Sequence, residues 1–330
     1  MAAPHPMAEL WRGGLLESRH LGLAVICDAK GVVEAWGDPA TVIFPRSSCK
    51  MIQALPLIES GAAEAAGLTD AHLAFACASH QGAHLHVDMA ARWLATLGLG
   101  EPDLRCGAHD PSDHTERNRL IKTDTSPCQL HNNCSGKHCG FLTLTQHLKA
   151  GPEYLALDHP LQIAIKSATE EVTGEATAGH GIDGCSAPNF ATTVHGLARA
   201  MAAFAVAKDS GSVRARAMHR LTRAMASHPE LVAGEGRACT ELMRAMGGRV
   251  AIKTGAEAVY VAILPDQGLG MALKITDGGT RAAEAAIAAL LVRAGVLDAN
   301  HPATRKRLNA VQRNWRGLET GILRAAPGFP

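Results

Sequence analysis

The chain has few aromatic residues and almost no net charge. Only 4% of its 330 residues are Phe, Trp or Tyr, and 32 Lys and Arg residues are offset by 31 Asp and Glu residues. A surface that binds nucleic acid usually combines basic side chains with aromatic rings on which bases stack. We therefore expect no nucleic-acid partner and no electrostatic attraction to an anionic membrane.

Long apolar runs and a secretory leader are also missing from the sequence. No stretch approaches the roughly 20 apolar residues that a membrane-spanning helix needs. The first six residues, MAAPHP, have neither a basic flank nor an apolar run. The nine cysteines are an odd number, which fits reduced thiols better than a disulfide framework. We expect a cytoplasmic protein with no membrane partner.

Hydrophobic residues make up 47% of the chain, which is enough for a sizeable core. A hairpin pattern covers residues 19–36, and strand patterns cover 249–253, 257–264 and 269–275. Helical patterns dominate between these strands, and a last helix is predicted over 302–312. Residues 100–140 read as irregular, with many polar residues, histidines and cysteines, which is typical of a functional segment.

This order of elements predicts an α+β fold. The strands at the two ends of the chain are expected to form one antiparallel sheet, drawn from about 15–45 and 248–330. Residues of about 46–247 are expected to form a mostly helical part. We predict that residues 1–330 make a single catalytic unit.

A Ser-x-x-Lys element at Ser47 and Lys50 is the most informative motif. If Ser47 opens a helix, the lysine shares its face and can reach the hydroxyl. A serine hydroxyl attacks poorly until a base takes its proton, and a lysine can do so once burial or a second cation lowers its pKa. An exposed serine beside a solvated lysine is the alternative interpretation of this tetrapeptide alone.

A Lys-Thr-Gly triplet at Lys253-Thr254-Gly255 supports the catalytic interpretation. This triplet commonly accompanies Ser-x-x-Lys in serine acyl-transfer enzymes that use no histidine base. It falls between two strand patterns, so the lysine can project from a strand end into a cleft. The two motifs together favour a serine–lysine amidohydrolase.

Two further segments carry thiols and other polar groups. The first is the segment His131-Asn132-Asn133-Cys134-Ser135-Gly136-Lys137-His138-Cys139-Gly140. The second is the segment Gly179-His180-Gly181-Ile182-Asp183-Gly184-Cys185-Ser186. Thiolates and imidazoles bind zinc, and spacing alone would favour His138 or Cys139 as ligands. The alternative is that these cysteines are small buried hydrophobic residues. Ser79, in Ala78-Ser79-His80-Gln81-Gly82, could line the same cleft or be an ordinary hydroxyl at a helix end.

These segments, taken in order, resemble the Rhizobium etli-type L-asparaginases, also called class 3. The resemblance rests on RSSCK at 46–50, ASHQ at 78–81, NCSGKH at 133–138, GIDGC at 181–185 and KTG at 253–255. It runs from about residue 15 to 295, and five motifs in sequence are far more specific than any one of them. It implies a fold similar to serine β-lactamases and glutaminases, and hydrolysis of L-asparagine to L-aspartate and ammonia.

The resemblance also implies roles for individual residues. Two serine–lysine pairs fall on Ser47 with Lys50 and on Ser79 with Lys253. A zinc ion near the nucleophile would be held by three ligands, which map onto Cys134, Lys137 and Cys185. Substrate contacts are expected from Arg46, His138 and Asp183. Relatives of this kind also suggest a homodimer.

Three alternative functions remain open from the sequence. A β-lactamase or peptidoglycan peptidase would use the same Ser–Lys machinery outside the cytoplasm. A glutaminase would use the same carboxamide chemistry in a pocket one methylene deeper. A zinc-binding regulatory module would bind metal without amidase activity.

Overall fold

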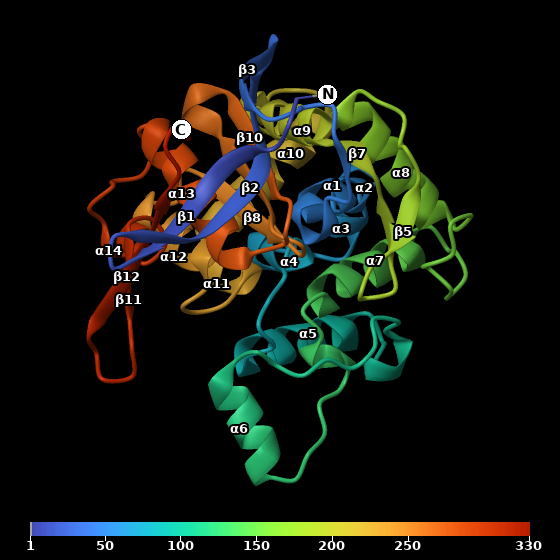
Figure 1. The fold of residues 1–330 in the computed structure, drawn as a ribbon. Helices are drawn as coiled ribbons and strands as arrows, with labels where there is room; N and C mark the ends of the chain where they lie inside the picture. Colours follow the sequence, from blue (N-terminus) through green and yellow to red (C-terminus); the bar gives the residue numbers. More distant parts are fainter. Residues whose placement is uncertain (1) are drawn as a thin grey trace. The chain divides into compact units, whose positions relative to one another are not determined.

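The structure is a computed structural model that describes residues 2–330. The chain forms two compact units, each assembled from separate stretches of sequence. The helices and strands of both units are labelled in Figure 1. Unit 1 contains the chain up to Ser48, then 192–206 and 238–330; unit 2 contains 49–191 and 207–237. Within the described residues, no helix has both the length and the apolar character that crossing a bilayer requires.

Unit 1 is built on an antiparallel sheet of eight strands. Seven of them follow the order β11-β12-β1-β2-β10-β9-β8, and β3 pairs with β2. In β2 and β10, Gly22 lies opposite Ile275, so the sheet joins the two ends of the chain as predicted. The predicted antiparallel α+β fold is confirmed. The strands are β1 (His5–Arg12), β2 (Leu15–Asp28), β3 (Gly31–Trp36), β8 (Ala251–Gly255), β9 (Val259–Leu264), β10 (Leu269–Ile275), β11 (Ala310–Arg313) and β12 (Glu319–Ala325).

Helices cover both faces of this sheet. Every residue of β9 is buried, and β9 contacts both α9 and α13. At Gly270 in β10 the strand backbone lies directly against the backbone of Ala202 in α9, with no room for a Cβ atom. The remaining elements of unit 1 are β4 (Val42–Ile43), η1 (Arg46–Cys49, which ends in unit 2), β7 (Thr192–Thr193), α9 (Val194–Val206), α12 (Ala238–Ala245), η4 (Pro265–Gln267), α13 (Thr280–Arg293) and α14 (Pro302–Arg305).

Unit 2 is mostly helical and packs around α7. All residues from Ser135 to Thr145 of this helix are buried, and it contacts α2, α3, α4, α5 and α8. The elements are α1 (Lys50–Gln53), α2 (Leu55–Glu59), α3 (Ala62–Ala65), α4 (Asp70–Ala76), α5 (His84–Thr96), η2 (Glu101–Asp103), α6 (His114–Lys122), η3 (Gln129–His131), α7 (Ser135–His147), α8 (Pro160–Thr173), β5 (His180–Ile182), β6 (Pro188–Phe190), α10 (Val213–Ser227) and α11 (Pro229–Val232).

Glycine brings α7 unusually close to α4. A Cβ atom on Gly136 would overlap the carbonyl oxygen of Phe75. It would also lie 2.7 Å from the Cγ atom of the Phe75 ring. The first turn of α7 therefore lies against the last turn of α4. One turn later, a Cβ atom on Gly140 would meet its nearest neighbours at 3.4 Å, which is ordinary contact.

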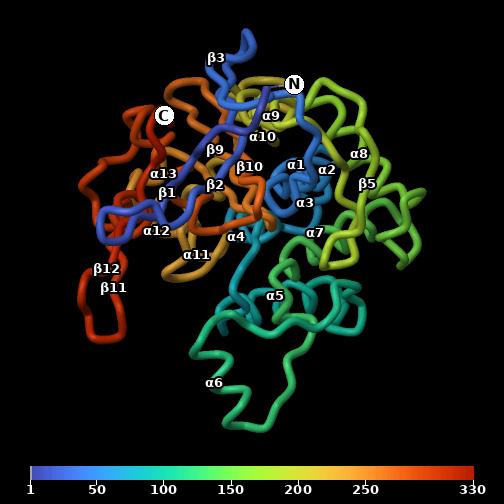
Figure 2. Tube along the Cα trace, viewed as in Figure 1, coloured from blue at the N-terminus to red at the C-terminus, as the bar shows by residue number. Residues whose placement is uncertain are grey.

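The prediction of an irregular segment over 100–140 is wrong in part, because this segment contains α6 and the start of α7. In Figure 2 the trace runs from α5 through α6 and returns to α7. Asp113 caps α6 by accepting the N–H of Glu116, so local polar contacts rather than an apolar stripe define this helix. In α7, burial on all sides removes the periodicity that identifies a surface helix.

The prediction of a helix over 302–312 is also wrong. Only α14 is helical there, and Asn309 has a φ of 56°, which a helix cannot continue through. Residues 310–313 form β11, which pairs with β12. Pairing with the next strand along the chain, which joins both to the large sheet, overrides the local helical pattern at this point.

Replacement of Gly136 by alanine tests the close packing of unit 2. We expect Gly136→Ala to lower the free energy of unfolding by about 1–3 kcal/mol, because the new methyl group cannot move away from a backbone carbonyl. Gly140→Ala, on the same helix, should be neutral or should stabilise by up to about 1 kcal/mol, because alanine has the higher helix propensity. Urea unfolding of both variants measures the difference; equal midpoints would contradict the packing described.

Candidate active site

Three lysines are almost completely buried, which is unusual for this residue type. The exposed fractions of Lys50, Lys137 and Lys253 are 1%, 3% and 0%. A buried ammonium group is costly unless hydrogen-bond acceptors or anions surround it. All three lysines belong to the sequence motifs, so these motifs are internal features and not solvated surface segments.

Lys50 opens α1 and is held in unit 2 by three acceptors. Its Nζ donates to the carbonyl oxygen of Ala78, to Ser79 Oγ at 3.0 Å and to Cys134 Sγ at 3.0 Å. An ammonium group has three donors, and all three are used here. The structure thus brings together Lys50, Ser79 and Cys134, which lie far apart in the sequence.

Ser79 follows the end of α4 in a segment that is fixed on both sides. The N–H of Ser79 donates to the carbonyl oxygen of Val232. The N–H of His80 donates to the carbonyl oxygen of Asn133. The His80 ring accepts the N–H of Gly82 at Nδ1, so its Nε2–H donates to Ser135 Oγ at 3.0 Å. These bonds connect the Ser79 segment to the start of α7.

Asn132 organises the residues that precede α7. Its Oδ1 accepts the N–H of Cys134 at 2.9 Å, and its Nδ2 donates to the carbonyl oxygens of Cys106 and Gly107, each at 2.9 Å. The side chain is 4% exposed. It satisfies three buried or half-buried backbone groups and fixes the backbone of Cys134.

Cys134, Lys137 and Cys185 form a second buried group in unit 2. Lys137 Nζ lies 2.9 Å from Cys185 Sγ, and the Cys134 thiol donates to Asn133 Oδ1 at 3.0 Å. Interaction with Cys185, together with burial, raises the pKa of Cys134 to about 12, whereas interaction with Cys134 and with the Lys137 ammonium lowers the pKa of Cys185 to about 4. Burial opposes the charge on Lys137, but the sulfurs of Cys185 and Cys134 raise its pKa overall.

These three residues fit a zinc ion in donor chemistry. Two sulfurs and one nitrogen lie near one another in unit 2, and zinc sites with three protein ligands leave a fourth position open. Binding would require the protons on Cys134 and Lys137 to leave. Across residues 2–330, no group of three or more His, Cys, Asp and Glu side chains is arranged to hold a metal ion.

Ser47 and Lys253 belong to unit 1. Ser47 lies in the 3₁₀ turn η1 and not in the helix expected from the sequence, since α1 begins only at Lys50. At Gly255 in β8 a Cβ atom would lie 2.6 Å from the carbonyl oxygen of Pro45 and 3.0 Å from the nitrogen of Ser48. The Lys-Thr-Gly strand therefore packs directly against the turn that carries Ser47.

The three residues predicted to contact the substrate differ in backbone conformation, burial and position in the fold. Arg46 precedes Ser47 and has a φ of 52°, a conformation that residues other than glycine rarely adopt. His138 is fully buried on α7; its Nδ1 hydrogen-bonds to Tyr154 Oη at 2.8 Å, and its Nε2 has no hydrogen-bond partner among the described residues. Asp183 is half-buried and begins the loop that carries Cys185, where its carbonyl oxygen accepts the N–H of Ser186.

Tyr154 and Asn132 support the site, but neither was predicted to have a role. Asn132 lies inside a segment that the sequence singles out, and its side-chain amide is typical of turns. Tyr154 is completely buried, and its hydroxyl also accepts the N–H of Arg105. Nothing in the sequence around Tyr154 indicates its contact with His138.

The sequence profile of the family described as L-asparaginase II matches residues 8–325. The chain belongs to the L-asparaginase II family. This confirms the expected relationship to asparaginases over nearly the whole length, and it supports an amidohydrolase. No curated protein matches the chain significantly.

Solved structures resemble this chain at low sequence identity. One is a β-lactamase from Mycobacterium bovis, with 14% identity, 84% of this chain and 95% of that chain covered, and a TM-score of 0.47. Another is a protein named Mglu in its tris and glutamate form, with 11% identity and a TM-score of 0.48. The match covers 91% of this chain and 65% of that chain. A third is a class C β-lactamase mutant with 13% identity and a TM-score of 0.41. The match covers 84% of this chain and 90% of that chain.

Removing the Asn132 side chain should weaken the whole segment before α7. Asn132→Ala leaves three backbone groups without partners, so we expect the free energy of unfolding to fall by about 2–4 kcal/mol. Asn314→Ala is the control, because Asn314 also accepts two backbone N–H groups, from Arg316 and Leu318, but in an exposed turn where water can replace it. Denaturant unfolding measures both; equal losses would contradict the role given to Asn132.

Proposed function

We propose that this protein is an L-asparaginase that hydrolyses L-asparagine to L-aspartate and ammonia. The observation that carries the proposal is the buried Lys50 ammonium between Ser79 Oγ and Cys134 Sγ. Lysine, hydroxyl and thiol groups buried together are expensive to maintain and are typical of catalytic sites. Membership of the L-asparaginase II family supports the choice of substrate.

Ser47 is the proposed nucleophile, and Lys50 is its base. Ser47 Oγ attacks the carboxamide carbon of the substrate while Lys50 Nζ takes the hydroxyl proton, so Lys50 must be neutral at that moment. Three residues of chain cannot separate two Cα atoms by more than about 11 Å, so connectivity alone keeps the pair close. Water then hydrolyses the acyl-enzyme. The developing oxyanion needs backbone N–H donors, and that of Ser47 is a candidate.

Ser79 and Lys253 are proposed to assist with proton movement. Ser79 Oγ already contacts Lys50 Nζ, so it can pass a proton between Lys50 and the departing ammonia. Lys253 is a buried cation on the strand that packs beside the Ser47 turn. A second positive charge favours the neutral form of a catalytic lysine.

Cys134, Lys137 and Cys185 are proposed to hold zinc. A bound zinc ion would act as a Lewis acid for the α-carboxylate and for the neutral form of the α-amine, and so would position the substrate. Arg46 offers a positive charge to the α-carboxylate, and Asp183 offers a hydrogen-bond acceptor to the α-amine. His138 offers a buried Nε2 for a hydrogen bond to the substrate. Binding of both α-substituents would distinguish a free amino acid from a peptide.

Ammonia release from L-asparagine, compared with L-glutamine, tests the reaction. We expect turnover of asparagine, with a weaker response to glutamine, because one extra methylene must be accommodated. Ser47→Ala should reduce kcat by a factor of about 10³ or more, as loss of the nucleophile does elsewhere. Ser79→Ala is the matched comparison and should retain more activity. A Ser47→Ala protein that is as active as the wild type would refute the assignment.

The zinc set is tested by metal content. Purified wild-type protein should contain about one zinc ion per chain, and Cys134→Ser and Cys185→Ser should each reduce the affinity at least tenfold. Cys139→Ser is the control, because Cys139 is buried on the same helix but its Sγ faces the carbonyl oxygen of Ala90. Chelation should raise KM for asparagine. Full activity at unchanged KM in metal-free protein would contradict the positioning role.

We also propose that the enzyme works as a homodimer in the cytoplasm. The resemblance to Rhizobium etli-type asparaginases supports the dimer, and the odd number of nine cysteines fits a reducing compartment. Light scattering of the purified protein should give twice the mass of 34.6 kDa. A monomer that retains full activity would exclude a functional role for the dimer.

A further inference from the structure

Cys128 differs from the other cysteines in its exposure. Eight of the nine cysteines are buried, whereas Cys128 is half-buried. It precedes η3 in unit 2, and none of the proposed catalytic steps uses it. Exposure alone does not make a thiol reactive, because the thiolate is the nucleophile. A neighbouring base is therefore required.

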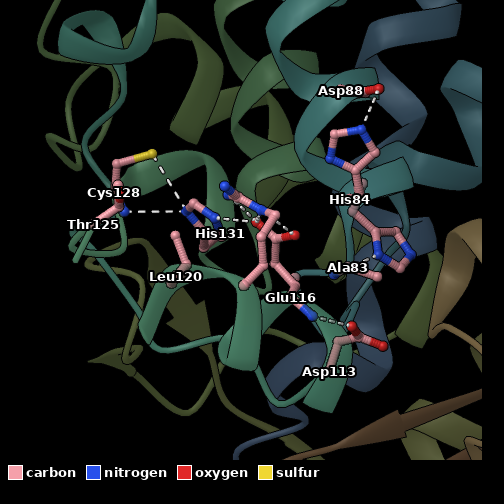
Figure 3. A network of polar contacts seen from close by, with 12 residues as sticks. Ala83, His84, Asp88, Asp113, Glu116, Leu120, Thr125, Cys128 and His131 are labelled. Carbon is pink, nitrogen blue, oxygen red and sulfur yellow. Dashed lines mark hydrogen bonds and ion pairs between the residues drawn. The ribbon is translucent and has the colours of Figure 1, made fainter. Parts of the chain in front are cut away.

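His131 supplies a base directly beside this thiol. Cys128 Sγ lies 3.4 Å from His131 Nδ1, and the backbone N–H of Cys128 donates to the same nitrogen at 3.1 Å. A backbone N–H can only donate, so Nδ1 is the unprotonated nitrogen and Nε2 carries the proton. The unprotonated Nδ1 is therefore the ring nitrogen that both the backbone N–H and the thiol of Cys128 approach (Figure 3).

Glu116 orients the imidazole from the opposite side. His131 Nε2–H donates to Glu116 Oε1 at 3.2 Å, and both side chains are almost completely buried. The Arg119 guanidinium bonds to both oxygens of Glu116 and holds the pKa of this carboxyl below its usual range. Asp113 fixes the backbone of Glu116 by capping α6. The carboxylate therefore stays ionised and in place.

The order of groups is thiol, imidazole and carboxylate. A nucleophile bonded to a base that is itself oriented by a third group is the general arrangement of an activated nucleophile. We propose that Cys128 is a base-activated thiol that reacts with low-molecular-weight disulfides to form a mixed disulfide. This would be a modification site separate in chemistry from the Ser–Lys amidase, and it does not depend on asparaginase activity.

The exchange balances without any further reagent. His131 Nδ1 takes the Cys128 proton, and the thiolate attacks one sulfur of the disulfide R–S–S–R. The bond between the two R–S groups breaks as the Cys128 Sγ–S–R bond forms. The departing R–S⁻ receives the proton from the His131 imidazolium and leaves as R–SH. Glu116 stabilises the imidazolium between the two proton transfers.

Proton transfer to Nδ1 removes the acceptor of the Cys128 backbone N–H, so one hydrogen bond is lost while the imidazole holds the thiol proton. His131 therefore takes the proton as the sulfur attacks and returns it to the leaving sulfur. This arrangement predicts assistance by a general base rather than a permanent ion pair.

Reaction of the full chain with oxidised glutathione at neutral pH tests the proposal. Peptide mass spectrometry follows the mixed disulfide at Cys128 with time, and Cys128→Ser shows which signal belongs to this site. We expect the folded protein to react about tenfold or more faster than an unstructured peptide of residues 125–130, which contains the same thiol without His131.

Three variants separate the roles of the neighbours. His131→Asn should slow modification of Cys128 about tenfold or more, and Glu116→Gln should slow it by a smaller factor. His84→Asn is the control, because His84 is an exposed histidine on α5 that pairs with Asp88 instead (Figure 3). Circular dichroism checks that each variant is folded.

Two results would overturn the proposal. One is a folded His131→Asn protein whose Cys128 reacts at the wild-type rate. The other is a wild-type Cys128 that reacts no faster than the peptide, a comparison that decides the matter even if His131→Asn fails to fold. Neither result concerns ammonia release, so failure of this proposal and failure of the amidase assignment remain distinguishable.

Discussion

The contact between the first turn of α7 and the last turn of α4 is the constraint on which unit 2 depends. The residues on each side of it are the ones whose chemistry matters: Ser79 follows α4, and Cys134 precedes α7. The absence of a side chain at Gly136 lets the two helices approach until Phe75 lies against the helix backbone. Because of that approach, Lys50 Nζ reaches acceptors from both segments at once.

The contacts around the α4–α7 packing also explain how Lys50 and Lys137 can be buried. A lysine amine in a dry interior is stable only where oxygen or sulfur acceptors replace its water, and each of these lysines has such acceptors. Lys50 has two oxygens and one sulfur, and Lys137 has the Cys185 sulfur. Reactivity and stability are therefore coupled for these two lysines: the contacts that make burial tolerable place Lys50 Nζ beside a hydroxyl and a thiol, and Lys137 Nζ beside a thiol.

The parts of the molecule that the sequence predicts are those governed by local pattern. The early hairpin and the strands around Lys253 were predicted because alternating apolar residues and turn residues mark them directly. Whether Ser79 lines the cleft of Lys50 or is an ordinary hydroxyl at a helix end stayed open from the sequence, because the approach depends on how α4 and α7 pack and not on spacing along the chain. Helix α7 escaped prediction for a related reason, since a helix buried on every side shows no polar face.

The C-terminal end of the chain shows a second limit of prediction from sequence. Pro302–Arg305 begins as the expected helix, but the chain then turns at Asn309 to pair β11 with β12. The family relationship covers this region and supports an amidohydrolase, but neither it nor local propensity gives the strand register. The placement of His131 between Cys128 and Glu116 is likewise a tertiary feature, since Glu116 comes from α6.

The pairing of β2 with β10 has a consequence for synthesis in the cell. β2 leaves the ribosome early, but its partner in the ladder emerges about 250 residues later. Until then one edge of an apolar strand lacks its permanent neighbour, and exposed strand edges promote aggregation. Unit 2 is encoded largely between these two strands, so most of it can form while the sheet is still open. A nascent chain of this kind should rely on chaperones more than a protein whose sheet closes between consecutive strands.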